Sequence, residues 1–136
     1  MEGRAQKHLA LIIARELASQ LVTATFIADA QGDLIFYNEA AETILGRTFA
    51  EAGTMSAGGW ATQFVLEDID GGPLPLDRMP AGIALLEQRP AHGKLWMTGL
   101  DGERRLVNVT AVPLFASASE LVGVIILFWQ SPPEEA

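Results

Sequence analysis

The chain has 136 residues, of which 49% are hydrophobic and 19% charged, and its net charge is −8. That length suits one domain with a sizeable core, and the composition excludes disorder of the whole chain. The sequence contains no cysteine, which excludes disulfides, thiolate metal sites and cysteine nucleophiles. The negative charge disfavours nucleic-acid binding, and no apolar run approaches the roughly 18 residues of a membrane span. We therefore expect a cytoplasmic protein with no nucleic-acid or membrane partner.

Residues 5–21 have the pattern of an amphipathic helix with an unusually broad apolar face. Ile12 lies in the middle of the otherwise polar arc. A helix that covers one core needs only one apolar stripe, so two interpretations remain open. The helix either packs on its own domain and leaves Ile12 exposed, or is shared with a second subunit. The pattern favours the second interpretation, a homodimer formed through residues 5–21.

A strand, a tight turn, a second strand and a capped helix follow one another without spare residues. Residues 22–29 are rich in β-branched and aromatic side chains, and residues 34–37 form the paired strand. The turn between them contains Gly32, flanked by aspartates that can accept backbone hydrogen bonds. Asn38 is a suitable N-cap for the next helix, and Gly46 stands where a left-handed residue would end it.

The second half of the chain begins with weakly patterned residues 47–62, where we expect short helical turns and loops. The turn signal Asp70-Gly71-Gly72-Pro73 predicts a small excursion or hairpin within residues 64–76. Pro80 begins a helix that runs to about Gln88. Three strands are predicted after it, over residues 93–99, 103–114 and 121–129. The last of them is nearly all apolar, which predicts a central position in the sheet.

This element order predicts an α+β domain, with a five-stranded antiparallel sheet and helices on one face. An N-terminal amphipathic helix precedes it. The expected organisation is a dimerisation helix over residues 1–21, the domain over residues 22–130 and a flexible tail over residues 131–136.

The chain resembles a PAS domain over roughly residues 20 to 129. The resemblance rests on short motifs in a fixed order: Phe26-Ile27-Ala28-Asp29-x-x-Gly32, Tyr37-Asn38-Glu39-Ala40-Ala41-Glu42 with Leu45-Gly46, Asp101-Gly102, Val107 to Leu114, and Gly123-Val124-Ile125. Each motif alone is weak, but their order and spacing together are fairly specific. The resemblance implies a sensory or docking role in signal transduction, such as two-component or transcription regulation. It also implies a pocket between sheet and helices and dimerisation through a helix before the first strand.

Two departures from the PAS pattern bear on output and cofactor. An Asp-x-Thr step often ends such domains in kinases, but residues 128–133 here read Phe-Trp-Gln-Ser-Pro-Pro. The prolines would block a continuous helix, so the chain stops at the natural end of the domain or signals through its N-terminal helix. The family members that bind a thiol-linked flavin or a thioester chromophore attach it to a cysteine. This chain has no cysteine, so both cofactors are excluded. Haem is disfavoured because the helix from Met79 to Gln88 lacks the axial histidine of haem-binding relatives.

Aromatic and aliphatic side chains are the best candidates for recognition in such a pocket. The candidates are Phe36, Ile44, Phe64, Leu85, Leu86, Trp96 and Thr98. The alternative is that they simply fill the core. Trp129, at the end of the last strand, is a candidate partner contact.

No catalytic or metal-binding residue is predicted. His8 and His92 have no carboxylate at metal-ligand spacing, and the acidic run before Gly71 lacks the terminal glutamate of a calcium loop. We predict a noncatalytic sensory module that homodimerises, regulates a partner or output domain, and binds a small apolar or aromatic ligand. The alternatives are a ligand-free docking domain and, less favoured, a small enzyme with a pocket acid such as Asp29.

Overall fold

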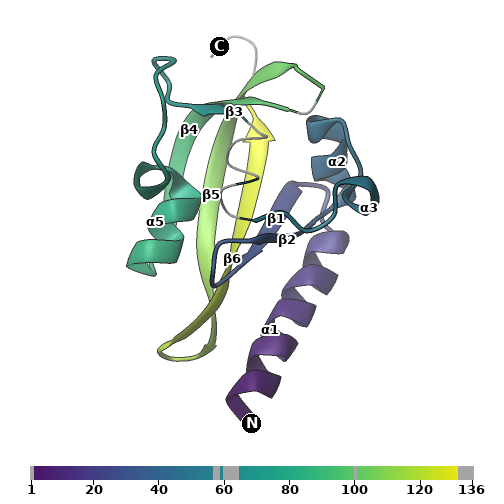
Figure 1. Cartoon of the computed structure of the whole chain (residues 1–136), viewed down its shortest axis with the longest axis vertical. Coiled ribbons are helices and arrows are strands. Elements are labelled where there is room, and N and C mark those ends of the chain that lie inside the picture. Colours follow the sequence, from purple (N-terminus) through teal and green to yellow (C-terminus); the bar gives the residue numbers. More distant parts are fainter. Residues whose placement is uncertain (1, 57–58, 60–64, 100, 132–136) are drawn as a thin grey trace.

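The computed structural model describes residues 2–56, 59, 65–99 and 101–131, with side chains from residue 9 onward. The elements in these ranges are α1 (Glu2–Ser19), β1 (Ala24–Asp29), β2 (Leu34–Tyr37), α2 (Glu39–Leu45), α3 (Phe49–Ala52), β3 (Val65–Glu67), η1 (Leu76–Arg78), α5 (Pro80–Glu87), β4 (Ala91–Thr98), β5 (Arg104–Ser117) and β6 (Glu120–Gln130). The strands form one antiparallel sheet in the order β2-β1-β6-β5-β4-β3 (Figure 1). The predicted α+β class is confirmed.

The sheet has six strands among the described residues, where five were expected. The extra strand is β3, which pairs with β4 at the sheet edge, Val65 opposite Thr98. It belongs to the segment for which an excursion or hairpin was predicted. The turn after it is closed by Asp68, whose Oδ1 accepts hydrogen bonds from the backbone of Asp70 and Gly72. A strand of three residues is too short for alternation to reveal it, and pairing with β4 stabilises it.

The predicted turn-strand-cap segment is confirmed. Asp29 Oδ1 accepts hydrogen bonds from the backbone of Gln31 and Asp33, which builds the turn between β1 and β2. Asn38 Oδ1 accepts a hydrogen bond from the backbone of Ala41 and caps α2. Gly46 ends α2 with a φ of 80°, a conformation that costs glycine little.

The predicted central position of the last strand is also confirmed, since β6 lies between β1 and β5. The three C-terminal strands are longer than expected, and the loop between β5 and β6 shrinks to a tight turn. Ser131 was assigned to the flexible tail, and this is wrong. Its backbone N–H donates to Leu106, its hydroxyl accepts from Asn108, and it is buried. Residues 132–136 of the predicted tail lie outside the described residues.

The two faces of the sheet are covered by different helices (Figure 1). Side chains of α2, α3 and α5 pack on the main core, which is built on inward-facing residues of the strands. The opposite, outer face carries a smaller cluster in which Ala14 and Ala18 of α1 contact Ile27. Helices of the domain itself thus occupy one face, as expected, and α1 occupies part of the other.

The N-terminal helix begins and ends earlier than predicted, at Glu2 and Ser19 rather than at residues 5 and 21. Gln20 and Leu21 leave the helix through tighter backbone hydrogen bonds to Leu17 and Ala18. The strand after it begins at Ala24, because Val22 has no strand partner and is 95% exposed. Residue propensities alone extend the helix and the strand into the segment that connects them, whereas pairing with β6 determines where the strand begins.

Candidate functional site

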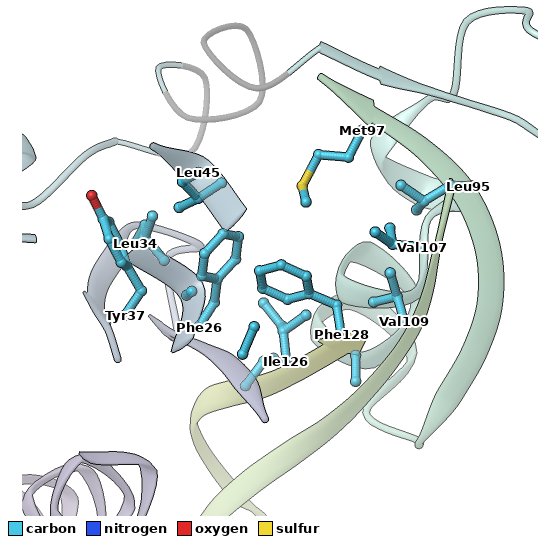
Figure 2. Close-up of a cluster of buried hydrophobic side chains, with 14 of the residues drawn as sticks. Phe26, Leu34, Tyr37, Leu45, Leu95, Met97, Val107, Val109, Ile126 and Phe128 are labelled. Carbon is cyan, nitrogen blue, oxygen red and sulfur yellow. The ribbon is translucent and has the colours of Figure 1, made fainter. Parts of the chain in front are cut away.

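The candidate site is the apolar space between the inner face of the sheet and the segment η1–α5. Figure 2 shows Phe26, Ile126 and Phe128 on one side of this space and Leu95 and Met97 on the other. The rings of Phe26 and Phe128 meet at a tilt of 58°, with 4.8 Å between their centroids. These side chains come from strands that are distant in sequence, and antiparallel pairing brings them to one face.

A cavity of about 30 Å³ remains within this packing. It is lined by Phe26, Leu66, Met79, Pro80, Ala81, Leu95, Met97, Val109, Ile126 and Phe128. Every one of these side chains is apolar, so the cavity offers no side-chain hydrogen bond to a ligand. The cavity therefore favours an apolar ligand group. Its two methionine side chains are flexible and can adapt to the shape of that group.

A second cavity of about 40 Å³ shares Ala81 and Ile126 with the first. It lies between α5 and the β1–β2 turn, where Gln31 is its only polar side chain. Both cavities are far smaller than the roughly 300 Å³ at which small-molecule pockets begin. A ligand larger than a few atoms would have to displace η1, α5 or the methionine side chains.

The structure does not gather the seven candidate pocket residues in one cavity. Ile44 packs on the main core, and Leu85 packs there and lines the second cavity. Phe36 lies on the outer face, because it pairs with Ile27 and contacts the α1 cluster. Leu86 is 60% exposed on α5. Phe64 lies outside the described residues.

Trp96 and Thr98 project from the outer face of β4. They alternate with Leu95 and Met97, which are buried on the inner face. The indole N–H of Trp96 donates to the carbonyl of Ile69, and the Arg104 guanidinium lies 4.0 Å from the ring centroid. Sequence reasoning chose the aromatic residue of this strand and missed its neighbours, although the alternation around Trp96 was the signal that could have identified Leu95 and Met97.

Met79, Phe26 and Phe128 were also missed as cavity residues. Met79 precedes Pro80 and N-caps α5 without a side-chain hydrogen bond, so its thioether is free to pack inward. Only the tertiary contact between η1 and α5 places it over the sheet, and no local pattern in the sequence reveals that.

Tyr37 and Asp29 are titratable residues near the core whose side chains make hydrogen bonds to the backbone, whereas His92 is exposed on β4. The Tyr37 hydroxyl donates to the carbonyl of Arg47 at 2.9 Å, and burial raises the pKa of Tyr37 above its usual value. The Asp29 carboxylate is engaged by the turn. His92 Nδ1 lies 2.8 Å from the hydroxyl oxygen of Thr110, and its ring lies beside Trp129, which is 43% exposed.

The part of the chain that the structure describes bears on two further kinds of site, a metal site and a membrane-spanning helix. No group of three or more histidine or carboxylate side chains there could hold a metal ion. None of the helices in this part is both long and apolar enough to cross a membrane. The first cavity can enclose an apolar group, because its lining side chains are all apolar and include no acid–base pair.

A second surface feature lies on α1, beside the face that packs on the sheet. Leu9, Ile13 and Leu17 are exposed by 56%, 58% and 55%. Their spacing of four residues places them on one stripe, about 100° around the helix from the buried Ala14 and Ala18. Ile12, 56% exposed, lies beside this stripe. The helix thus has two apolar faces, and the domain itself covers one of them.

Known proteins resemble this chain in structure and not in sequence. No protein-family profile and no curated protein matches the sequence. Among solved structures, the PAS domain of BvgS from Bordetella pertussis is 22% identical, with a TM-score of 0.65, covering 92% of this chain and 89% of that one. A PAS domain from Colwellia psychrerythraea is 18% identical, with a TM-score of 0.62 and coverages of 89% and 96%. The PAS domain of nitrogen regulation protein NR(II) from Vibrio parahaemolyticus is 15% identical, with a TM-score of 0.59 and coverages of 88% and 98%.

These similarities extend over nearly the whole chain. The identities are low, so they speak for the architecture rather than for a shared ligand. The chain has the PAS fold.

Proposed function

We propose that this chain is a noncatalytic sensory module that homodimerises through α1, binds a small apolar or aromatic ligand in its core, and regulates a partner or output domain. The observation that carries the proposal is the second, exposed apolar face of α1. Monomeric proteins seldom leave a contiguous apolar stripe uncovered. The similar solved structures include a PAS domain from a two-component sensor histidine kinase, which agrees with a role in signalling.

The dimer would bury Leu9, Ile13 and Leu17 of each copy against the other copy. Burying the exposed part of one isoleucine contributes about 1.4 kcal/mol, and a symmetric dimer counts it twice. Ile13→Glu should therefore raise the dimer dissociation constant about 100-fold or more. Leu86→Glu is a matched control, because Leu86 is also a helical residue and is 60% exposed, on α5. Sedimentation of both variants and of the parent chain over a concentration series measures the difference.

An unchanged dissociation constant for Ile13→Glu would place the interface elsewhere, and a monomeric parent chain would refute dimerisation. If Leu86→Glu weakened the dimer as much as Ile13→Glu, the effect would come from added charge in general. The two variants together therefore separate the α1 stripe from any exposed apolar residue.

The ligand is tested by native mass spectrometry of the purified chain followed by denaturing extraction. A small molecule that leaves on denaturation supports sensing. The two adjoining apolar cavities support this part of the proposal, and the flexible Met79 and Met97 side chains that line the first cavity allow it to widen. Indole, added to the chain, should shift the NMR signals of these two methyl groups before any others.

A ligand-free docking domain is the second candidate, and the small volume of the cavities favours it. An empty dimer whose methionine methyl signals ignore indole would support docking over sensing. An enzyme is disfavoured because the Asp29 carboxylate, the acid considered for that role, is already engaged by backbone N–H groups of the turn.

A further inference from the structure

Asn38 has a buried side chain at the point where three elements meet, and only 2% of the residue is exposed. Its Oδ1 accepts a hydrogen bond from the backbone N–H of Ala41 at 3.0 Å, which caps α2. The same oxygen accepts a second hydrogen bond from the backbone N–H of Thr25 in β1, also at 3.0 Å. One oxygen atom therefore joins the first turn of α2 to the start of β1.

The amide nitrogen of Asn38 points to the end of α1. Nδ2 donates to the carbonyl of Ala18 at 2.9 Å and to the carbonyl of Thr23 at 2.9 Å, with a longer contact of 3.4 Å to the carbonyl of Leu21. The last carbonyls of a helix have no partner within the helix, and α1 has no basic residue in its last turn. The Ala18 carbonyl accepts one hydrogen bond from the backbone N–H of Leu21, and the Asn38 side chain supplies a second donor from outside the helix.

This arrangement connects α1 to the wall of the apolar cavity. Thr25 precedes Phe26, which lines the cavity, and Ala41 is buried in the main core. A shift of Phe26 along β1 moves the Thr25 N–H and hence the oxygen of Asn38. Because the amide is rigid and planar, the nitrogen that holds α1 moves with that oxygen.

We infer that Asn38 is a positioning residue that couples α1 to the cavity wall, so that a change in the packing of the core reaches the helix. The inference rests on the proposed sensory function and deepens it by naming the route from the core to the dimer helix. Coupling of this kind requires one element whose position depends both on the cavity wall and on α1. In this inference that element is the Asn38 amide.

The side chain allows a selective test, because its two ends can be separated chemically. Asn38→Asp keeps an oxygen for Ala41 and Thr25 and so keeps the cap of α2. It removes the donor and sets a carboxylate against the carbonyls of Ala18 and Thr23. Asn38→Ser is a second variant, since serine is also a good cap but is too short to reach those carbonyls.

The experiment measures amide hydrogen exchange of α1 and of β5–β6 in the full chain, with β5–β6 as the reference for global stability. In Asn38→Asp and Asn38→Ser, exchange in the last turns of α1 should accelerate about tenfold or more beyond any change in β5–β6. Asp68→Ala is the control, because it opens the turn after β3, at the sheet edge opposite β2, and should leave the ratio of the two exchange rates unchanged.

The coupling itself is measured with Phe26→Leu, which alters the cavity wall and requires no ligand. In the parent chain this substitution should change α1 exchange relative to β5–β6. In the Asn38→Asp or Asn38→Ser background the relative change should fall to a third or less. An equal response of α1 in both backgrounds would overturn the inference, and so would α1 exchange that merely follows β5–β6 in both Asn38 variants.

The test is independent of the dimer and of the ligand. If the parent chain is monomeric or ligand-free but the exchange of α1 depends on Asn38 as stated, the inference stands and the proposed function fails. If the dimer and ligand are found but the two backgrounds respond equally, the proposed function stands and the inference fails.

Discussion

Gly82 in α5 gives a sharp test of how the cavity wall is held, because two physical effects there predict opposite signs. Glycine in a helix is less favourable than alanine by about 1 kcal/mol, so propensity alone predicts that Gly82→Ala stabilises the protein. The tertiary contact predicts the reverse. A Cβ added at Gly82 would lie 1.6 Å from the carbonyl oxygen of Leu76 and 2.6 Å from its carbonyl carbon.

The magnitude follows from the displacement that alanine would require. To reach 3.0 Å, the Cβ and the Leu76 oxygen must separate by 3.0 − 1.6 = 1.4 Å, and both belong to backbone segments rather than to flexible side chains. Overpacking of this kind costs about 3 kcal/mol. After the propensity gain is subtracted, Gly82→Ala should lower the free energy of unfolding by about 2 kcal/mol.

Urea denaturation at one fixed protein concentration measures this loss. With a slope of about 2 kcal/mol per molar, the midpoint should fall by about 1 M. Gly102→Ala is the control, because Gly102 has a φ of 80° and a Cβ added there would meet no heavy atom within 4 Å beyond its chain neighbours, so only backbone strain of about 1 kcal/mol is expected. A Gly82→Ala midpoint at or above that of the parent chain would refute the close contact between η1 and α5.

Two further substitutions test the core and the α1 contact. Tyr37→Phe removes the hydrogen bond to the Arg47 carbonyl and should cost about 1 kcal/mol in urea denaturation at neutral pH. Because the pKa of Tyr37 is raised in the folded state, the contribution of Tyr37 to the free energy of unfolding is fully present below the ordinary tyrosine pKa and is lost as pH rises through the folded pKa. Tyr37→Phe should therefore reduce the loss of stability at alkaline pH. An unchanged dependence of stability on alkaline pH would contradict this role of Tyr37. Arg15→Gln removes the guanidinium that lies 4.7 Å from the centroid of the Phe36 ring and should cost about 0.5–1 kcal/mol, whereas no change in thermal unfolding would mean that the contact contributes nothing.

Local patterns in the sequence predicted the elements whose geometry is set by near neighbours. The Asp29 turn, the Asn38 cap and the end of α2 at Gly46 each depend on hydrogen bonds or backbone angles within a few residues. The helix that begins at Pro80 and the central position of β6 followed from residue type and apolar run length. Such signals survive in one sequence because the interactions behind them are local.

Most pocket residues could not be assigned in the same way: alternation shows which side chains of a strand share a face, but long-range strand pairing decides which of the two faces meets the core. A shift of one residue moves a strand's side chains to the opposite face, and the pairing of Ile27 with Phe36 places Phe36 toward α1. Trp96 faces outward for the same reason, while Leu95 and Met97 face the cavity.

Asn38 combines a local interaction and long-range interactions in one side chain. Its role as the cap of α2 is local and was predicted from the sequence, but its bonds to α1 and β1 exist only in the folded chain. The sequence therefore specified the scaffold and the two-sided character of the N-terminal helix. Tertiary structure alone decided which apolar residues enclose the cavity and which polar side chain joins the cavity wall to that helix, because both depend on contacts between residues far apart in the chain.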